Sequence, residues 1–451
     1  MTNVIGLTQG IRRDFPTMLE VGLPLLHAFR RLRPSMIEWL CLVAGSYLVF
    51  HYSWLLDDAY VYFRYVDNLL YLNLGLVNNE GEYVEGFSSP CWAIWLIILR
   101  ATGLNYWFLV RAAGMVCFWG VWLMLVVMQR RLAPSNQPHA NLPLCFVSFA
   151  YGPLCYFTSG LESPLVQATA VAYALFVLNP GSIMWSLAVS LSPLVRQELA
   201  ATFVLAGVWS AWRRRKIPWV LVAAGVIGNG AWLGFRIYYY ADLLPNTFYL
   251  KDTIDVAQGF GYLRDTFDVY GVHFFVAASF FLLWIMVRRR QVETVDDAAS
   301  TDEVNPFWIR ERLAMLVLSA MVMVYVVKIG GDPRHYRFLA FPALLVMCAG
   351  GGVVERTIAT LRWPAPRLTT FVMGSSICVL LFAAYPRQLF GHPFLNGVNI
   401  VGSTRSPMHM AIADARRCLR RGGPGELRSN RKRCMPKCWT LVPPSSSASS
   451  R

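Results

Sequence analysis

Two adjacent carboxylates, Asp57 and Asp58, end an apolar run in the segment WLLDDAYVYFRY, residues 54–65. Neighbouring acids repel each other unless they share a proton or a cation, which suits a general base or a metal ligand. The alternative is helix capping, in which one aspartate is the N-cap of an interfacial helix over 59–70. Capping accounts for one carboxylate only, so the pair is a candidate catalytic site.

Two shorter motifs also place charge beside apolar runs. Glu162 lies in SGLESP, and its alternative role is in a tight loop whose Pro164 begins the next helix. Arg196 and Glu198 lie in LVRQEL, residues 194–199. They either pair with each other across a helix break after Pro193, or the arginine holds a phosphate. The sequence leaves both interpretations open.

The densest group of charges is GGDPRHYRFL, residues 330–339, with Asp332, Arg334, His335 and Arg337. One interpretation is a glycine-rich hairpin whose basic side chains extend to the membrane surface. The other is a cation cluster that binds a phosphate-bearing ligand. A weaker motif, LLPNTFYLKD at 243–252, adds Asn246 and Lys251, although Pro-Asn is also a common turn.

The composition indicates helices in a membrane. The 451 residues are 56% hydrophobic and 15% charged, include 16 Trp, and have a mean hydropathy of +0.43. Continuous apolar runs favour an all-α polytopic membrane protein over a closed β-barrel, whose strands alternate. We expect about eleven transmembrane helices, at 36–56, 106–128, 142–157, 164–178, 182–195, 199–212, 217–239, 270–287, 312–329, 336–354 and 369–386.

The distribution of Arg and Lys predicts the orientation. Basic clusters at 12–33, 130–131, 213–216, 288–312 and 356–367 recur at alternate span ends, which marks that side as cytoplasmic. The polar motifs above then fall at the outer ends of spans, where ionisable residues are functional candidates. The net charge of +15 follows from this bias and from the basic tail, so we expect no nucleic-acid partner.

The remaining segments complete the predicted organisation. Residues 1–35 are a basic cytoplasmic N-terminus, 36–386 the membrane domain, and 57–105 its first outer loop, with an interfacial or re-entrant helix at 90–100. Residues 387–451 read as an extracytoplasmic tail, disordered or truncated. The ten cysteines include no CxxC pair, so we interpret them as small buried hydrophobic residues.

In this order, the motifs resemble the integral-membrane GT-C glycosyltransferases, in the branch typified by mycobacterial terminal arabinofuranosyltransferases. The resemblance covers about residues 36–350. It rests on the acid pair with Arg64 and Glu85 in the first outer loop, and on SGLESPL, LVRQEL, LPNTFYLK and GGDPRHYRFL. Gln197 stands where that branch usually has Pro, and the expected soluble C-terminal domain is missing or scrambled.

This resemblance implies transfer of a pentofuranose such as arabinofuranose from a polyprenyl-phosphate carrier. The acceptor is an envelope glycan or a pilin-like surface protein at the outer face of a bacterial inner membrane. Asp57 and Asp58 match the acidic pair, with one as the base. Arg196, Arg334 and Arg337 fall where cations hold the lipid phosphate, while Glu85, Glu162 and Glu198 match acidic positions of the cavity.

A cation must stabilise the departing phosphate, and the sequence leaves open whether it is arginine or a divalent metal such as Mg²⁺ or Mn²⁺ held by Asp57 and Asp58. Two other functions also remain: a flippase or transporter of lipid-linked saccharides, and an inactive assembly subunit.

Overall fold

The computed structural model describes residues 34–132, 140–249, 254–272, 276–277, 281, 307–332, 334, 336–360 and 366–383. Within these residues the chain is helical and contains no β-strand, which confirms the predicted all-α class. The elements are α2 (Met36–His51), α3 (Ala59–Leu70), α4 (Pro90–Arg100), α5 (Tyr106–Leu132), α6 (Leu142–Phe149), α7 (Tyr151–Cys155), η2 (Tyr156–Thr158), α8 (Ser163–Leu178), α9 (Ile183–Ser190), α10 (Ser192–Val195), α11 (Leu199–Arg214), α12 (Trp219–Tyr240), α13 (Asn246–Tyr249), α14 (Val256–Tyr270), α16 (Phe307–Lys328), η3 (Arg337–Leu339), α17 (Ala340–Thr360) and α18 (Pro366–Ala383).

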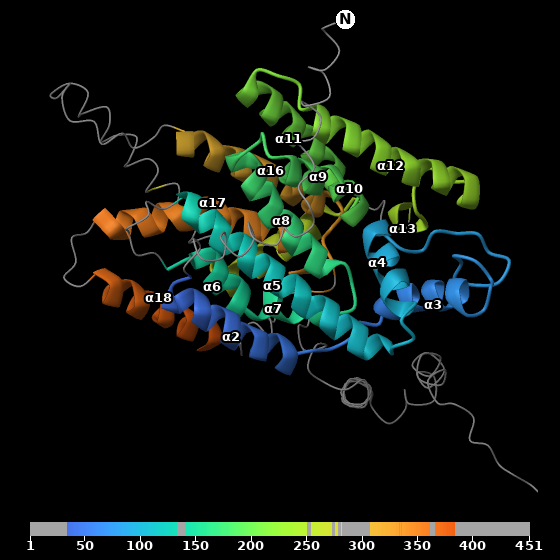
Figure 1. Cartoon of the computed structure of the whole chain (residues 1–451), viewed down its shortest axis with the longest axis horizontal. Coiled ribbons are helices and arrows are strands. Elements are labelled where there is room, and N and C mark those ends of the chain that lie inside the picture. The colour runs from blue at the N-terminus through green and yellow to red at the C-terminus, as the bar shows by residue number, and fades with distance from the viewer. Residues whose placement is uncertain are drawn as a thin grey trace, which may run out of the picture.

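Helices α8 and α17 lie at the centre of the bundle and pack against each other. Helix α17 also packs on α16 and α6, and α8 packs on α5 and α9 (Figure 1). Helices α3 and α4 contact each other and lie with α13 at one end of the bundle. The segment that carries α3 and α4 therefore lies beside the main bundle.

Local sequence explains where several of these helices begin. Ser35 and Glu38 form a reciprocal capping box at the start of α2. The Ser89 hydroxyl accepts a hydrogen bond from the Trp92 amide at 3.3 Å, and Pro90 follows in the first turn of α4. Proline suits that position because the first-turn amides have no partner within the helix.

Most predicted spans coincide with helices, but two of them are broken. The range 142–157 divides into α6, α7 and η2, because Ala150 adopts an extended backbone conformation. The range 182–195 divides into α9 and α10, and Pro193 lies in the first turn of α10, where its missing amide hydrogen leaves no helical bond unmade. Most of 270–287, nearly all of 1–35 and all of 387–451 lie outside the described residues.

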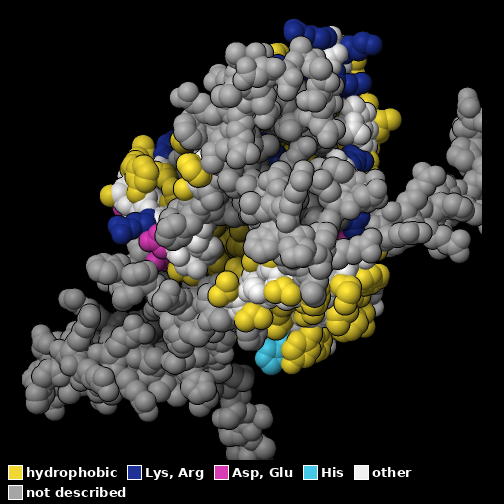
Figure 2. All heavy atoms as spheres, turned by 90° about the vertical axis from the view of Figure 1, so that its left-hand side faces the viewer, with side chains coloured by type: hydrophobic (Ala, Val, Ile, Leu, Met, Phe, Trp, Pro, Cys, Tyr) yellow, Lys and Arg dark blue, Asp and Glu magenta, His cyan; other side chains and the backbone are white. Residues whose placement is uncertain are grey.

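Two of the described helices, α5 and α12, are long and apolar enough to cross a membrane. Large apolar side chains remain exposed on α2 and α12, among them Trp39, Tyr47, Ile227 and Tyr238. Figure 2 shows hydrophobic side chains gathered in a broad patch on one face of the molecule. Such surfaces are costly in water and suit contact with lipid. The count of eleven spans remains a prediction.

The interior has two hydrophobic clusters. The larger one joins α2, α5, α6, α8, α16 and α17. The smaller one is built mainly from residues 56–96, including Tyr62, Phe87 and Trp92, and reaches Leu161 just before α8. Among the predicted polar residues, Glu162 directly follows Leu161 of the smaller cluster, and Arg337 directly precedes Phe338 of the larger one.

Candidate active site

The acid pair lies between α2 and α3, and Asp58 occupies the N-cap position of α3. Its side chain makes no capping hydrogen bond. The Asp57 carboxylate accepts a hydrogen bond from the Asp58 amide at 3.0 Å instead. Helix α3 begins at Ala59 as predicted, but the capping alternative is wrong for Asp58, whose carboxylate turns away to meet arginines.

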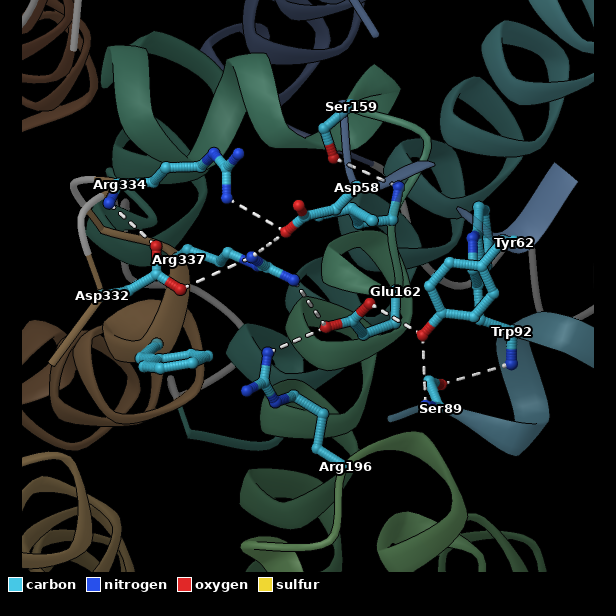
Figure 3. A network of polar contacts seen from close by, with 12 residues as sticks. Asp58, Tyr62, Ser89, Trp92, Ser159, Glu162, Arg196, Asp332, Arg334 and Arg337 are labelled. Atoms are coloured by element: carbon cyan, nitrogen blue, oxygen red, sulfur yellow. Dashed lines mark hydrogen bonds and ion pairs between the residues drawn. The ribbon is translucent and has the colours of Figure 1, made fainter. Parts of the chain in front are cut away.

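Those arginines come from the GGDPRHYRFL motif, more than 270 residues along the chain (Figure 3). Arg334 binds both Asp57 and Asp58, with 3.0 Å between its Nη1 and Asp58 Oδ2. Arg337 Nη1 lies 2.9 Å from the same oxygen and 3.4 Å from Asp332 Oδ2. Two guanidinium groups therefore converge on one carboxylate oxygen of Asp58.

The loop itself is shaped to present these side chains. Gly330 and Gly331 both have positive φ, and a Cβ on Gly331 would lie 2.5 Å from the Tyr262 ring. Asp332 accepts the Arg334 amide at 2.8 Å, and the Tyr262 hydroxyl donates to the Arg334 carbonyl at 3.1 Å. The hairpin interpretation is therefore incomplete, because Arg337 is buried instead of extending to the surface.

Below the acid pair lies a buried layer centred on Glu162, at the start of α8. Arg196 Nη1 donates to Glu162 Oε1 at 2.8 Å, and Arg337 Nη2 lies 3.8 Å from that oxygen. Arg196 also binds Glu198 and lies over the Phe338 ring at 4.4 Å. The Arg196–Glu198 pair thus bridges the break between α10 and α11. The same arginine also pairs with the buried Glu162.

Tyr62 on α3 joins this layer to Ser89, the residue just before α4. Its hydroxyl donates to Glu162 Oε2 at 3.4 Å and accepts the Ser89 amide at 3.1 Å (Figure 3). Burial raises the pKa of the Tyr62 hydroxyl well above its ordinary value, so the group keeps its proton and remains a donor. Tyr62 therefore fixes the distance between α3, α4 and the start of α8.

The solvent exposure of the acidic side chains in this ion-pair network decreases from Asp57 to Glu162. The Asp57 side chain is 77% exposed and that of Asp58 44%, while Glu162 is fully buried. Arg337 Nε is buried and finds no hydrogen-bond partner among the residues that the structure describes. A ligand that reaches Asp58 thus meets an accessible carboxylate first and an unsatisfied guanidinium donor behind it.

A second polar group holds the segment between α3 and α4 to α12. Arg236 binds both oxygens of Glu85, with 3.3 Å between Nη2 and Oε1, and Trp232 Nε1 donates to Oε1 at 3.3 Å. The Asn246 amide donates to the Glu85 carbonyl at 3.0 Å. Burial raises the pKa of the Glu85 carboxyl, although the hydrogen bond from Arg236 lowers it.

The predicted site residues divide accordingly. Eight join the ion-pair network of the acid pair, and Glu85 and Asn246 form the second group. Arg64 is exposed on α3 and belongs to neither group. Lys251 and His335 lie outside the described residues. The network residues are Asp57, Asp58, Glu162, Arg196, Glu198, Asp332, Arg334 and Arg337.

The acid pair fits a divalent cation poorly. Arg334 already binds a carboxylate oxygen of each aspartate. Within the described part of the chain, no third carboxylate or histidine offers a ligand atom close to both. Mg²⁺ and Mn²⁺ prefer several oxygen ligands, so the arrangement favours guanidinium groups as the counter-charge.

Three functional candidates escaped the sequence analysis. Arg236 is the single charged residue in the apolar run of α12, and that isolation was a signal. Tyr62 and Phe338 carry no such signal, since nothing local reveals that they contact Glu162 and Arg196.

Comparison with known proteins gives one relative. The chain is 29% identical over 332 residues to a terminal β-(1→2)-arabinofuranosyltransferase of Corynebacterium glutamicum, with 65% of this chain and 47% of the relative covered. The chain therefore spans about half the length of the curated relative that it matches. No family model and no solved structure matches. The comparison supports the resemblance to this branch of glycosyltransferases.

Proposed function

We propose that the chain is a multi-pass glycosyltransferase of a bacterial inner membrane. Its donor is a polyprenyl-phosphate pentofuranose such as arabinofuranose, and its acceptor is an envelope glycan or a surface protein at the outer face. The observation that carries this proposal is the accessible Asp58 carboxylate, backed by Arg337 with an unsatisfied Nε donor. The name of the Corynebacterium glutamicum relative supports the reaction class.

In the proposed mechanism, the acceptor hydroxyl approaches Asp58, whose carboxylate takes the hydroxyl proton as the new glycosidic bond forms. All contacts of this carboxylate with the described residues go to Oδ2, so Oδ1 faces the substrate. The bond between the anomeric carbon and the phosphate oxygen breaks, and its electron pair leaves with polyprenyl phosphate. Arg334 and Arg337 stabilise this negative charge. Glu162 and Asp332 keep the buried Arg337 in place.

The leaving group determines the depth in the membrane at which the catalytic residues must lie. Polyprenyl phosphate stays at the membrane surface, so base and arginines must lie at the same level. Asp58 and Arg337 meet that condition through direct contact at 2.9 Å. A divalent cation is not needed for this scheme, and chelation of metal by EDTA tests its role separately.

The test is the Asp58→Asn variant, which keeps the shape of the side chain and removes its basicity. General-base contributions are typically about 10²–10⁴-fold, so transfer from radiolabelled polyprenyl-phosphate arabinofuranose to an arabinan oligosaccharide should fall by at least about 100-fold. Glu80→Gln is the matched control, because Glu80 is an exposed acid of the same loop. Full transfer by a normally inserted Asp58→Asn variant would refute the proposal.

A further inference from the structure

Three cysteines that are far apart in the sequence meet in the interior. Cys41 lies on α2, Cys145 on α6 and Cys378 on α18, and these helices pack side by side (Figure 1). Cys41 Sγ lies 4.0 Å from Cys145 Sγ, and all three sulfur atoms lie within 4.8 Å of one another. All three side chains are buried. The three cysteines are therefore buried, as expected from the sequence. The sequence did not reveal that they lie next to one another.

The spacing of the sulfur atoms fits a single soft metal ion. With metal–sulfur bonds of about 2.3 Å, three ligands in one plane around the ion lie about 4.0 Å apart. The distance between Cys41 and Cys145 meets this value, and the third sulfur needs only a small approach. A disulfide requires sulfur atoms in direct contact and would leave one of the three thiols over.

The ligand set discriminates between metals. Zinc in structural sites takes four ligands, and an iron–sulfur cluster takes four cysteines. The described residues provide three, with no histidine, aspartate or glutamate in ligand distance of the sulfur atoms. Thiolates select soft ions such as Cu(I), which accepts three sulfur ligands.

Polar groups lie next to the cluster. Glu38 precedes Cys41 by one helical turn, and Asn141 precedes Cys145 by one turn. The two side chains are joined by a 2.9 Å hydrogen bond, and the partly exposed Arg130 binds Glu38 at 2.5 Å. One turn after Cys145, the buried Ser148 hydroxyl has no hydrogen-bond partner among the described residues. Polar side chains thus extend from the partly exposed Arg130 through Glu38 and Asn141 to within one helical turn of the cysteines.

We propose that Cys41, Cys145 and Cys378 form a trigonal binding site for one Cu(I) ion, which ties α2, α6 and α18 together. This site is distinct from the ion-pair network of Asp58 and does not depend on the proposed transferase activity. Since the three ligands come from separate helices, bound copper links segments at both ends of the described chain.

The test uses the full chain, purified in detergent under reducing, oxygen-free conditions and titrated with Cu(I) against the chelator bathocuproine disulfonate. We expect one equivalent to be retained, and X-ray absorption to show three sulfur neighbours at one distance near 2.3 Å. Cys145→Ser and Cys378→Ser should each weaken retention at least tenfold. Cys91→Ser and Cys117→Ser are the controls, because these cysteines are half-buried outside the cluster.

Three results would overturn the proposal: no retained copper, equal retention by the cluster variants, or a Cys41–Cys145 disulfide in the isolated chain. Retention of zinc in preference to copper would overturn the assignment of the metal. The absorption spectrum of the unchanged chain decides the matter even where a serine variant does not fold.

Discussion

The ion pair between Glu85 and Arg236 provides a quantitative test of how the segment between α3 and α4 is held to α12. Arg236→Met removes two guanidinium contacts from a buried carboxylate and leaves Trp232 as its side-chain donor among the described contacts. Removing one partner of a buried ion pair costs roughly 3–5 kcal/mol, since the other charge stays buried and uncompensated. We therefore expect the free energy of unfolding to fall by about that amount.

The double variant Glu85→Gln/Arg236→Met distinguishes charge from packing. It removes both charges, so its cost should be only about 1–3 kcal/mol, the price of imperfectly satisfied polar groups. Equilibrium unfolding in mixed dodecyl maltoside and SDS micelles is followed by circular dichroism. It is measured for the unchanged chain, Glu85→Gln, Arg236→Met and the double variant, which together form a double-mutant cycle. Arg264→Met is the control, because Arg264 and Asp268 form an exposed pair at 3.5 Å worth about 0–1 kcal/mol.

The pH dependence of the same variants gives a second readout. Burial raises the pKa of Glu85 above its ordinary value of 4.5, so the folded chain binds this proton more tightly than the unfolded chain. The contribution of this group is most favourable below pH 4.5 and declines as pH rises through the raised pKa. Without Arg236 the pKa of Glu85 rises further, so Arg236→Met should lose more stability between acid and neutral pH than the unchanged chain.

Two results would refute this reasoning. One is an Arg236→Met variant within about 1 kcal/mol of the unchanged chain at pH 7, which is the range of an exposed salt bridge. The other is a double variant as unstable as Arg236→Met alone, which would assign the loss to packing instead of charge.

Two further predictions concern the packing around the site. Gly114→Ala should destabilise the chain by about 1–3 kcal/mol in the same unfolding assay, because the new Cβ would lie 2.0 Å from the Phe157 carbonyl oxygen. Gly120→Ala in the same helix has nothing within 4 Å and should not destabilise, so equal effects would contradict the predicted clash. Tyr62→Phe leaves the buried Ser89 amide without its acceptor and should cost about 1–3 kcal/mol, whereas Tyr60→Phe, on the exposed face of α3, should be neutral. A neutral Tyr62→Phe would show that the link between α3 and α4 does not depend on this hydroxyl.

Much of the fold was predictable because apolar length and local capping act within a few residues. The helix at 59–70 begins and ends as expected, and PCWAIWLIILR forms α4 over Pro90–Arg100. The breaks inside 142–157 and 182–195 were not predicted, although Pro153 and Pro193 mark both places. Apolar composition alone does not distinguish one long helix from two short ones that are buried together.

The sequence by itself determined that the chain is helical and apolar, and that acidic and basic residues stand at the ends of its apolar runs. Only the tertiary structure decided which charges pair. It turned the Asp58 side chain from a cap toward Arg334 and Arg337, joined Glu85 to the lone arginine of α12, and brought three dispersed cysteines together. The physical reason is that a buried charge is stable only beside a partner, and that partner is selected by how distant helices pack, not by neighbours in the chain.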